Sequence, residues 1–581
     1  MAEDPFGKNS DEYIIDVPPL DYNPEERGLG YQYFESMKNY GDRIAQYIED
    51  TDEEDTYENL LTRCIRVAIW LKSKELTNED VVTLCSKNHK DSCVPFIACL
   101  FLGIPVASLD PMLSAMDTTH LLKEVRPKIL FVESKSVRLI DDCLTEAGID
   151  AEVVVYGEIE DHACFQELLT PQEDEGEFQP EVVASLEETA IVLFSSGTTG
   201  LPKGIMISHY ALLMQCQNMK QSENFGNVML SYATLYWIST VIILTTMTYI
   251  GGARVICSKF NPKQTWLLIE KYQITSMFIP PSQMAELIAC GRPENLDTSK
   301  LHCCISGGAS VSEKQMREIR DLLPGTFVFQ MYGQSEIAGI ITIFNSNDVK
   351  DVLLLDKKPK SVGKVVAGIC CKVVNPDTEE LCGPNKNGEL RLKSKMSMNG
   401  YYGRDSSESY DSDGWLRTGD EVYYDEDKCF YVVDRIKEML KYRSWHVAPA
   451  MIEQVLCIIA LVMVELTELY FSRCAYEMVI LGTGGYLLIC SVMLLTILAD
   501  ELSPYAEISF LLFGSIFNLL GGILMFIRSG FYKKNFRWTY VGPVNGTATE
   551  KYEVFAATAV TGLSSVMIVD LLVELFALIL S

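Results

Sequence analysis

The chain is poor in positive charge, in histidine and in the cysteine patterns that bind metals. Its 49 lysine and arginine residues face 79 aspartate and glutamate residues, which gives a formal net charge of -30. A protein that binds nucleic acid needs an excess of basic side chains for the phosphates, so this balance argues against a nucleic-acid partner. The 18 cysteines and 6 histidines are scattered, without a CxxC pair or a histidine at ligand spacing. This pattern argues against structural zinc and predicts reduced, intracellular thiols.

Two kinds of targeting signal are not found either. The first residues, MAEDPFGKNSDEY, are acidic and polar, whereas a secretory signal peptide has a basic start and an apolar stretch. The last residues, LALILS, do not match the Ser-Lys-Leu peroxisomal address. We therefore expect the chain to reside in a membrane, through the apolar segments described next.

After Leu456 the chain becomes strongly apolar. Runs of about 20 apolar residues have the length that a bilayer core requires. The sequence therefore predicts an all-α, multi-pass membrane tail over 457–581, with three or four helices at about 457–471, 478–499, 508–527 and 554–576. The first of these is the weakest, because Glu465 and Glu468 lie in it. A glycosylation sequon at Asn545 favours a luminal loop and four spans, whereas basic residues nearby favour three, so the orientation stays open.

Before Leu456 the composition is that of an α/β protein. Short β-branched runs alternate with amphipathic stretches, which favours a mostly parallel sheet flanked by helices. The expected strands lie in VVTLCS, KILFVES, AEVVVYG, AIVLFSS, ARVICS and SMFIPP. The apolar run over 235–252 is long enough for a membrane span, but its threonines and the strand that follows favour a buried helix. We place this part of the chain in the cytosol.

The stretch FSSGTTGLPKG, residues 194–204, follows one of these expected strands. Its glycines let backbone N–H groups turn toward an anion, its hydroxyls add donors, and Lys203 adds a mobile charge. It is not a Walker loop, because Pro202 and Gly204 flank the lysine instead of the glycine and hydroxyl residue of that motif. A flexible surface turn is the alternative for such a stretch taken alone.

This loop resembles the phosphate loop of the adenylate-forming superfamily, which includes acyl-CoA synthetases, coumarate-CoA ligases and beetle luciferases. Four further motifs follow in the order of that family. They are SGGA at 306–309, YGQSE at 332–336, GWLRTGD at 414–420, and DRIKE at 434–438 with the segment 441–449. The resemblance covers roughly residues 30–456 and implies a large AMP-binding domain over 1–432, with a hinge and a remnant of the family's carboxy-terminal lobe over 433–456.

The resemblance also implies roles for individual residues. ATP would be bound by Ser195, Ser196, Gly197, Thr198, Thr199, Gly200, Lys203, Gly307, Gly308, Ala309, Tyr332, Gly333, Ser335, Asp420 and Arg435. Lys203, Glu336 and Lys441 would be catalytic, and Glu336 would also bind Mg²⁺. The acyl pocket would include Tyr236, Trp237, Ile238 and Gly339, whose apolar character suits a fatty or aryl acid. His209 matches a histidine common in the family, and a helix-cap or core role is an equal alternative.

The implied reaction joins a carboxylic acid to ATP, giving an acyl-adenylate and pyrophosphate, and then transfers the acyl group to CoA. The family's PKTxxGK-like motif, whose lysine contacts the carboxylate and the α phosphate, has no counterpart after Leu456. We therefore predict ATP binding with impaired turnover. Two alternatives are a membrane-anchored nucleotide-binding pseudoenzyme, and a fusion of a ligase fragment with an unrelated multispan protein. In the last case the expected location would be the peroxisome or cytosol. Luciferase-type oxygenation is not indicated by any residue.

Overall fold

A computed structural model describes residues 13–195, 202–436, 440–442 and 445–447, the last two segments and Ser195 as backbone only. These residues belong to one compact unit that runs to Ile452. The membrane helices expected after Leu456 lie outside the described residues. Within the described part of the chain, no helix is both long and apolar enough to cross a bilayer.

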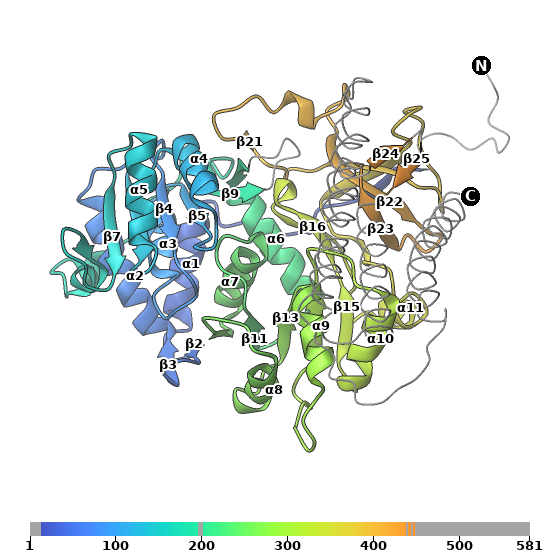
Figure 1. Ribbon diagram of the computed structural model, residues 1–581, viewed down its shortest axis with the longest axis horizontal. Coiled ribbons are helices and arrows are strands. Elements are labelled where there is room, and N and C mark those ends of the chain that lie inside the picture. The colour runs from blue at the N-terminus through green and yellow to red at the C-terminus, as the bar shows by residue number, and fades with distance from the viewer. Residues whose placement is uncertain (1–12, 196–201, 437–439, 443–444, 448–581) are drawn as a thin grey trace, which may run out of the picture. The chain divides into compact units, whose positions relative to one another are not determined.

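An eight-stranded sheet forms the amino-terminal part of this unit (Figure 1). Its strands, in spatial order, are β21 (Gly400–Tyr401), β10 (Lys203–Ser208), β9 (Thr189–Ser195), β5 (Val106–Leu109), β4 (Val82–Cys85), β6 (Ile129–Glu133), β7 (Glu152–Tyr156) and β8 (Ala163–Cys164). From β9 to β8 all neighbours are parallel, whereas β10 is antiparallel to both β9 and β21. The expected strands in this region are confirmed.

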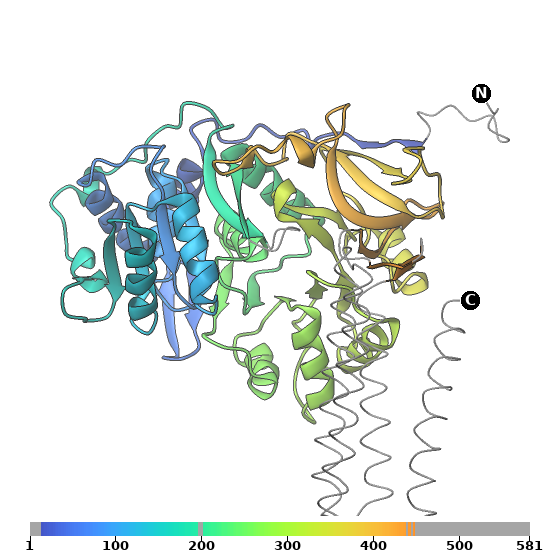
Figure 2. The ribbon, with the colours of Figure 1, turned by 45° about the horizontal axis from the view of Figure 1, so that its top comes forward.

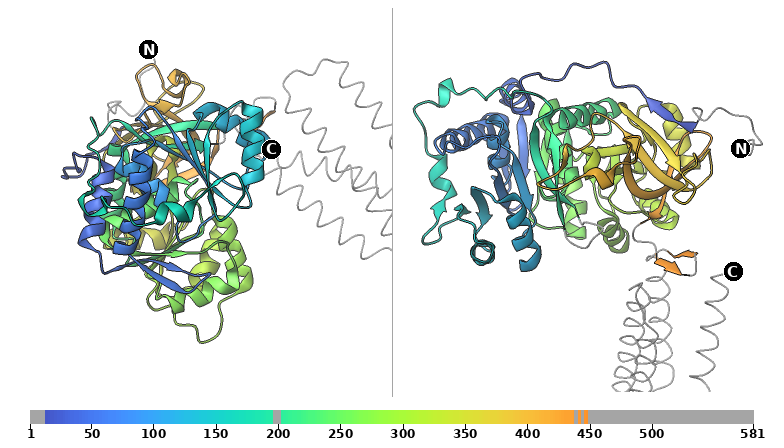
Figure 3. Two further views of the ribbon diagram at one scale, coloured as in Figure 1. Left: turned by 90° about the vertical axis from the view of Figure 1, so that its left-hand side faces the viewer. Right: turned by 90° about the horizontal axis from the view of Figure 1, so that it is seen from above.

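Helices cover both faces of this sheet, as Figure 3 (left) shows. Apolar side chains of α4 (Ala115–Val125) and α5 (Val137–Ala147) pack on one face. On the other face lie α2 (Tyr57–Lys72) and α3 (Val94–Phe101). Burial on both faces explains why these strands are continuous apolar runs.

A second sheet has seven strands. Its order is β15 (Phe327–Gln330), β14 (Cys303–Ser306), β13 (Ser276–Phe278), β11 (Val228–Ser231), β12 (Ala253–Ile256), β2 (Ile44–Ile48) and β3 (Glu53–Thr56), and all neighbours are parallel except β2 and β3. One face packs on α8 (Pro262–Lys271), α9 (Pro281–Cys290) and α10 (Glu313–Leu322). The other packs on a core shared with the first sheet, which includes α1 (Leu29–Asn39), α6 (His209–Ser222) and α7 (Ile238–Ile250). The apolar run over 235–252 is thus a buried helix, α7, as the sequence favoured.

A third, antiparallel sheet was not foreseen from the sequence. Figure 2 shows it in yellow to orange, except for one blue strand from the start of the chain, and away from the blue strands of the first sheet. It orders β1 (Ile15–Val17), β19 (Ile369–Val374), β20 (Gly388–Lys393), β22 (Leu416–Tyr424) and β23 (Phe430–Arg435). Smaller sheets comprise β16 (Tyr332–Gln334), β17 (Gly339–Ile343) and β18 (Lys364–Val365), and the pair β24 (Leu440–Tyr442) and β25 (Trp445–Val447). The other helices are α11 (Val349–Lys357) and the 3-10 turns η2 (Phe165–Leu169), η3 (Glu175–Glu177), η4 (Ser335–Ile337) and η5 (Ser407–Ser409).

Candidate nucleotide site

A buried carboxylate lies where the antiparallel sheet approaches β16. Asp420, on β22, is only 3% exposed. Its Oδ2 accepts a 2.5 Å hydrogen bond from the Tyr332 hydroxyl and a 2.7 Å hydrogen bond from Gln334 Nε2. Arg435, its cross-strand neighbour on β23, places Nε 3.4 Å from Oδ1. The structure therefore brings together three motifs that are far apart in the sequence, YGQSE, GWLRTGD and DRIKE.

The local reason for this meeting is the short strand β16. Side chains at alternate positions of a strand point to the same face, so Tyr332 and Gln334 both reach Asp420 while Gly333 faces away. A Cβ atom on Gly333 would lie 2.0 Å from the carbonyl oxygen of Gly339 on the neighbouring strand. Glycine is therefore required at this position, because any side chain would push β16 away from β17.

Glu336 and Lys203 form the second part of the site. Glu336 lies in the turn η4 after β16, and its backbone carbonyl accepts a 2.8 Å hydrogen bond from Met398 N. Burial raises the pKa of its carboxyl group, and the nearby positive charges of Arg435 and Lys203 offset part of that rise. Lys203 begins β10, and its Nζ lies 5.0 Å from the centroid of the Tyr401 ring. Two of the three predicted catalytic side chains, Lys203 and Glu336, thus share one region of the fold.

The SGGA turn begins at the carboxyl end of β14, beside the end of β15 that leads to Tyr332. Met331 N donates a 2.9 Å hydrogen bond to the carbonyl oxygen of Ser306, which links the two ends. Gly307 is buried, and a Cβ there would lie 3.3 Å from the carbonyl oxygen of Met331; Gly308 has a φ of 90° and is exposed. Carboxyl ends of adjacent parallel strands are where open α/β sheets bind ligands. The turn and the YGQSE segment therefore lie next to each other at such an edge of the sheet.

Fewer contacts are described for the other predicted ATP-binding and catalytic residues. Ser335 begins η4 and is half-buried, and Ala309 is exposed. Ser195 ends β9, where its Cα pairs with that of Lys203. Lys441 is described only as backbone, in β24 opposite His446. Ser196, Gly197, Thr198, Thr199 and Gly200 lie outside the described residues.

The predicted acyl-pocket residues fall into two groups. The Tyr236 ring lies edge-on to Trp237, with 5.3 Å between centroids, and Tyr236 lines a small cavity with Leu235 and Leu109. The Trp237 side chain itself is exposed, at 54%. Ile238 lies instead beside Gly339, because a Cβ on that glycine would be 3.7 Å from Ile238 Cγ1. Ile238 and Gly339 thus lie together, whereas Tyr236 lines a different, small cavity.

His209 has a core role in this structure. It is fully buried at the first position of α6, after the capping residue Ser208. Its Nδ1 accepts a 3.2 Å hydrogen bond from Leu29 N, and burial lowers the pKa of the imidazole to about 4. Of the alternatives left open by the sequence, the buried core position is the one observed.

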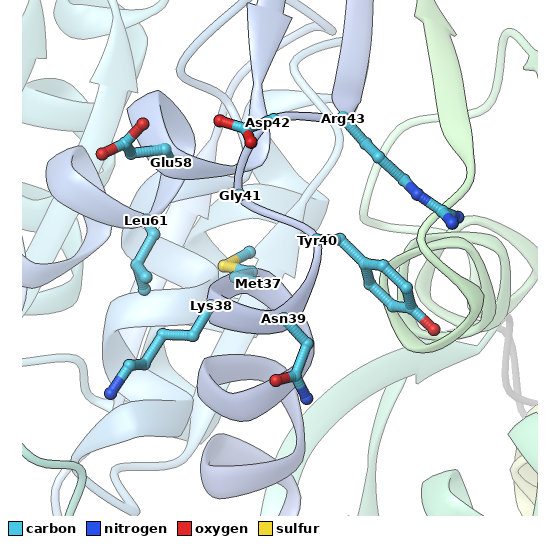
Figure 4. Close-up of a pocket in the computed structure, with 9 residues that line it drawn as sticks. All are labelled: Met37, Lys38, Asn39, Tyr40, Gly41, Asp42, Arg43, Glu58 and Leu61. Carbon is cyan, nitrogen blue, oxygen red and sulfur yellow. The ribbon is translucent and has the colours of Figure 1, made fainter.

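A separate surface hollow of about 650 Å³ lies where α1 ends and α2 begins (Figure 4). Its lining includes Lys38, Asp42, Arg43 and Glu58, and none of the motif residues. The charged ends of these side chains point in different directions in Figure 4 instead of converging on one point. The hollow therefore lacks the convergent polar groups of a small-molecule site.

Gln334 is a site residue that sequence reasoning did not assign. Its amide donates to Asp420 and also, at 2.9 Å, to the carbonyl oxygen of Thr418. The available signal was its place within YGQSE, two residues from Tyr332 on a strand. Glu124, which lies outside all five motifs, accepts a hydrogen bond from Gly204 N.

Comparison with known proteins gives a consistent result. Residues 33–402 match the family model described as "AMP-binding enzyme". A "Luciferin 4-monooxygenase" of Photuris pensylvanica is 31% identical over 460 residues, which cover 75% of this chain and 82% of that protein. The chain belongs to the AMP-binding enzyme family. The "4-coumarate--CoA ligase-like 9" of Arabidopsis thaliana is 27% identical over 411 residues, covering 69% of this chain and 70% of the relative.

A solved structure extends this similarity to three dimensions. It is the luciferase-like enzyme from the nonluminescent Zophobas morio mealworm, which is 40% identical with a TM-score of 0.71. The match covers 73% of this chain and 99% of the mealworm chain. The adenylate-forming fold expected from the motifs is thereby confirmed for the part of the chain that the structure describes.

The side chains at this candidate site suit a nucleotide and a hard cation. Asp420 offers a buried carboxylate among hydrogen-bond donors, and hydroxyl groups of a sugar are natural partners for such an acceptor. Mg²⁺ in nucleotide sites commonly takes one or two carboxylates together with phosphate oxygens. Among the described residues no cluster of three or more histidine, cysteine, aspartate or glutamate side chains is placed to hold a metal ion.

Proposed function

We propose that this chain is an ATP-dependent, carboxylate-activating enzyme of the acyl-CoA ligase type. The observation that supports this most directly is the convergence of Tyr332, Gln334 and Arg435 on the buried carboxylate of Asp420. Asp420 would accept hydrogen bonds from the ribose hydroxyls, Tyr332 would stack on adenine, and Arg435 would reach the ribose or a phosphate from the hinge.

The phosphates and the cation would lie on the other side of the site. Ser195 to Gly200 and Lys203 would bind the β and γ phosphates, with the SGGA residues Gly307, Gly308 and Ala309 beside adenine. Glu336 would bind Mg²⁺ through its carboxylate, with Ser335 next to it. The carboxylate substrate, a fatty or aryl acid, would occupy the apolar walls formed by Tyr236, Trp237, Ile238 and Gly339.

Catalysis in such a site consists mainly of positioning and charge neutralisation. The acid's oxygen attacks the α phosphorus in line, pyrophosphate leaves, and CoA then takes the acyl group from AMP. Lys203 and Glu336 with its Mg²⁺ would neutralise charge on the phosphates. Lys441, after the hinge, would be the remaining basic group of the carboxy-terminal segment.

We further propose that turnover is impaired. After Leu456 the only lysines are Lys533, Lys534 and Lys551, and none stands in a PKTxxGK-like motif. Loss of one preorganised donor to a developing charge costs about 2.7 to 4 kcal/mol, or roughly 10²- to 10³-fold in rate. This same observation favours a second candidate function, a module that binds nucleotide without turnover, for which the tail predicted over 457–581 would be the membrane anchor.

ATP–pyrophosphate exchange and equilibrium ATP binding test both proposals on the full chain. We expect MgATP binding together with slow exchange when fatty and aryl acids are supplied. Exchange as fast as that of a complete synthetase would contradict the impairment. Binding with no exchange for any acid would favour the second candidate, and no ATP binding would overturn both.

A further inference from the structure

Residues that do not belong to the five motifs form hydrogen bonds with the backbone at the start of β10. Gly204 follows Lys203, and its N–H donates a 2.7 Å hydrogen bond to Glu124 Oε1. Its carbonyl oxygen accepts a 2.8 Å hydrogen bond from Tyr402 N. Gly204, which directly follows the predicted phosphate-binding lysine, is thus hydrogen-bonded through both of its backbone polar groups, to α4 and to the segment after β21.

Glu124 is an unusual residue for its position. Its side chain is only 6% exposed, and it lies in the last turn of α4, where the helix dipole disfavours negative charge. A buried carboxylate in such a place requires compensation by hydrogen bonds or an opposite charge. The Gly204 N–H supplies the hydrogen bond, and the Arg404 guanidinium contacts the other carboxylate oxygen.

His120 completes this group, one helical turn before Glu124. Its Nε2 lies 3.0 Å from the carbonyl oxygen of Pro202 and 3.2 Å from Arg404 Nη2. Pro202 and Gly204 flank Lys203, so two side chains of one helix contact the backbone on either side of the lysine. These are specific polar contacts with the Pro202 carbonyl and the Gly204 N–H, which nonspecific packing of α4 against β10 does not explain.

The space around Gly204 shows how closely the elements meet. A Cβ there would lie 3.1 Å from Val192 Cγ1, 3.2 Å from Glu124 Oε1 and 3.2 Å from Tyr402 Cβ. The glycine therefore allows the carboxylate to approach the backbone. Lys203 itself lies over the ring of Tyr401, the residue before Tyr402, so the same segment contacts both the lysine and its successor.

We propose that Glu124 is a positioning residue for Lys203: it fixes the backbone at Gly204 and so holds the lysine toward Glu336 and the nucleotide phosphates. Arg404 and His120 hold Glu124 and the Pro202 carbonyl in this arrangement. This role rests on the proposed ATP site. Glu124, Arg404 and His120 would support that site through the backbone around Lys203, and none of them belongs to a motif.

Equilibrium binding of MgATP to the full chain tests this role. Glu124→Ala is expected to raise the Kd for MgATP about tenfold, the size of effect that corresponds to loss of one charge-assisted hydrogen bond. Glu124→Gln keeps an oxygen that can accept from Gly204 N and should recover part of the affinity. Arg404→Gln should cause a smaller loss of affinity for MgATP. Because the Arg404 side chain is partly exposed, this change does not leave a cavity in the core.

Glu175→Ala is the matched control. Glu175 also accepts a backbone N–H, from Gln172 at 2.5 Å, and pairs with an arginine, Arg66 at 2.6 Å, but it contacts none of the residues around Lys203. Its removal should leave the Kd for MgATP unchanged. Thermal unfolding of all variants identifies any that do not fold, in which case Glu124→Gln and Arg404→Gln carry the comparison.

A double-mutant cycle separates positioning from a merely structural effect. If Glu124 acts through Lys203, Glu124→Ala should weaken MgATP binding in the natural background but not when Lys203→Ala is already present. A loss of equal size in both backgrounds would overturn the inference, and so would an unchanged Kd in Glu124→Ala and Glu124→Gln. If the unaltered chain bound no MgATP, the proposed function itself would be wrong. If the unaltered chain binds MgATP but the Glu124 variants do not behave as expected, only the role proposed for Glu124 is wrong.

Discussion

The phenol of Tyr332 donates a 2.5 Å hydrogen bond to the carboxylate of Asp420, across 88 positions of the sequence. Burial raises the pKa of the phenol well above its ordinary value, and the negative charge of Asp420 acts in the same direction. The hydroxyl therefore stays protonated and acts as a donor at physiological pH. A ligand hydroxyl that binds Asp420 must share its acceptor oxygens with Tyr332 and Gln334, which fixes the direction of approach.

Replacement of Asp420 should weaken ATP binding strongly. Asp420→Asn removes the negative charge and turns one acceptor oxygen into a donor, which conflicts with the Tyr332 and Gln334 donors and with ribose hydroxyls. We expect the Kd for MgATP to rise about ten- to a hundredfold, equivalent to roughly 1.4 to 2.8 kcal/mol, measured by equilibrium dialysis.

Asp425→Asn is a suitable control for that change. Asp425 also accepts a hydrogen bond from a tyrosine, Tyr431 at 2.9 Å, and pairs with Lys358, but it lies beyond the end of β22. We expect thermal stability to fall and MgATP affinity to stay the same. A loss of affinity as large as that of Asp420→Asn would show that the effect is not local to the site.

The dependence of ATP binding on Mg²⁺ should change with pH through Glu336. Burial raises the pKa of this carboxyl group above its ordinary value, so the proton binds more tightly in the folded state. Folding stability from this group is present at low pH and is lost as pH rises through the raised pKa. Mg²⁺ binds the ionised form, so we expect the gain in ATP affinity on adding Mg²⁺ to grow across the same window.

Glu336→Gln separates these two effects. The variant cannot ionise, so the gain in its ATP affinity on adding Mg²⁺ should be smaller and should no longer grow from about pH 5 to pH 8. Its free energy of unfolding should likewise no longer decrease with rising pH through ionisation of this side chain. Isothermal titration with and without Mg²⁺, together with denaturant unfolding at each pH, measures both. A Mg²⁺ dependence equal to that of the natural chain would contradict the assignment of Glu336 as the metal ligand.

His209 should make the fold sensitive to acid. Burial lowers its pKa from 6.5 to about 4, so the neutral imidazole is favoured in the folded state. The stabilisation is present above the unfolded pKa and is lost as pH falls toward 4, an amount on the order of 3 kcal/mol. In His209→Asn the free energy of unfolding should fall less steeply with acid over this window.

His302→Gln is the matched control for the acid effect, because His302 is exposed. Its unfolding free energy should follow the pH dependence of the natural chain. Equal slopes for His209→Asn and the natural chain would show that another group dominates the acid response.

The tail after Leu456 gives a prediction about the polypeptide itself. If 457–581 is a multi-pass membrane tail, the full chain should remain in the membrane pellet after alkaline carbonate extraction, and a chain ending at Leu456 should not. Mass spectrometry of the intact protein should detect a peptide that spans Gln454 to Leu461. Absence of that peptide beside peptides from both flanks would favour the fusion alternative, with a peroxisomal or cytosolic location for the ligase part.

The sequence alone determined the family, the buried strands and helix α7, and the five motifs. It could do so because strands buried on both faces are continuous apolar runs, and because phosphate and ribose sites need glycines, hydroxyls and carboxylates close together in the chain. The antiparallel sheet was missed, since its strands come from segments as distant as β1 and β23 and have no single periodic pattern.

Only the tertiary structure decided which motifs meet. Gln334 reaches Asp420 because β16 and β22 come together in space, and Glu124 reaches Gly204 because α4 packs on the sheet beside β10. Trp237 is apolar in type but exposed, and His209 belongs to the core. Local residue types determine which chemistry is available, whereas contacts between residues 80 or more positions apart depend on how the layers pack, and no local pattern in the chain encodes that packing.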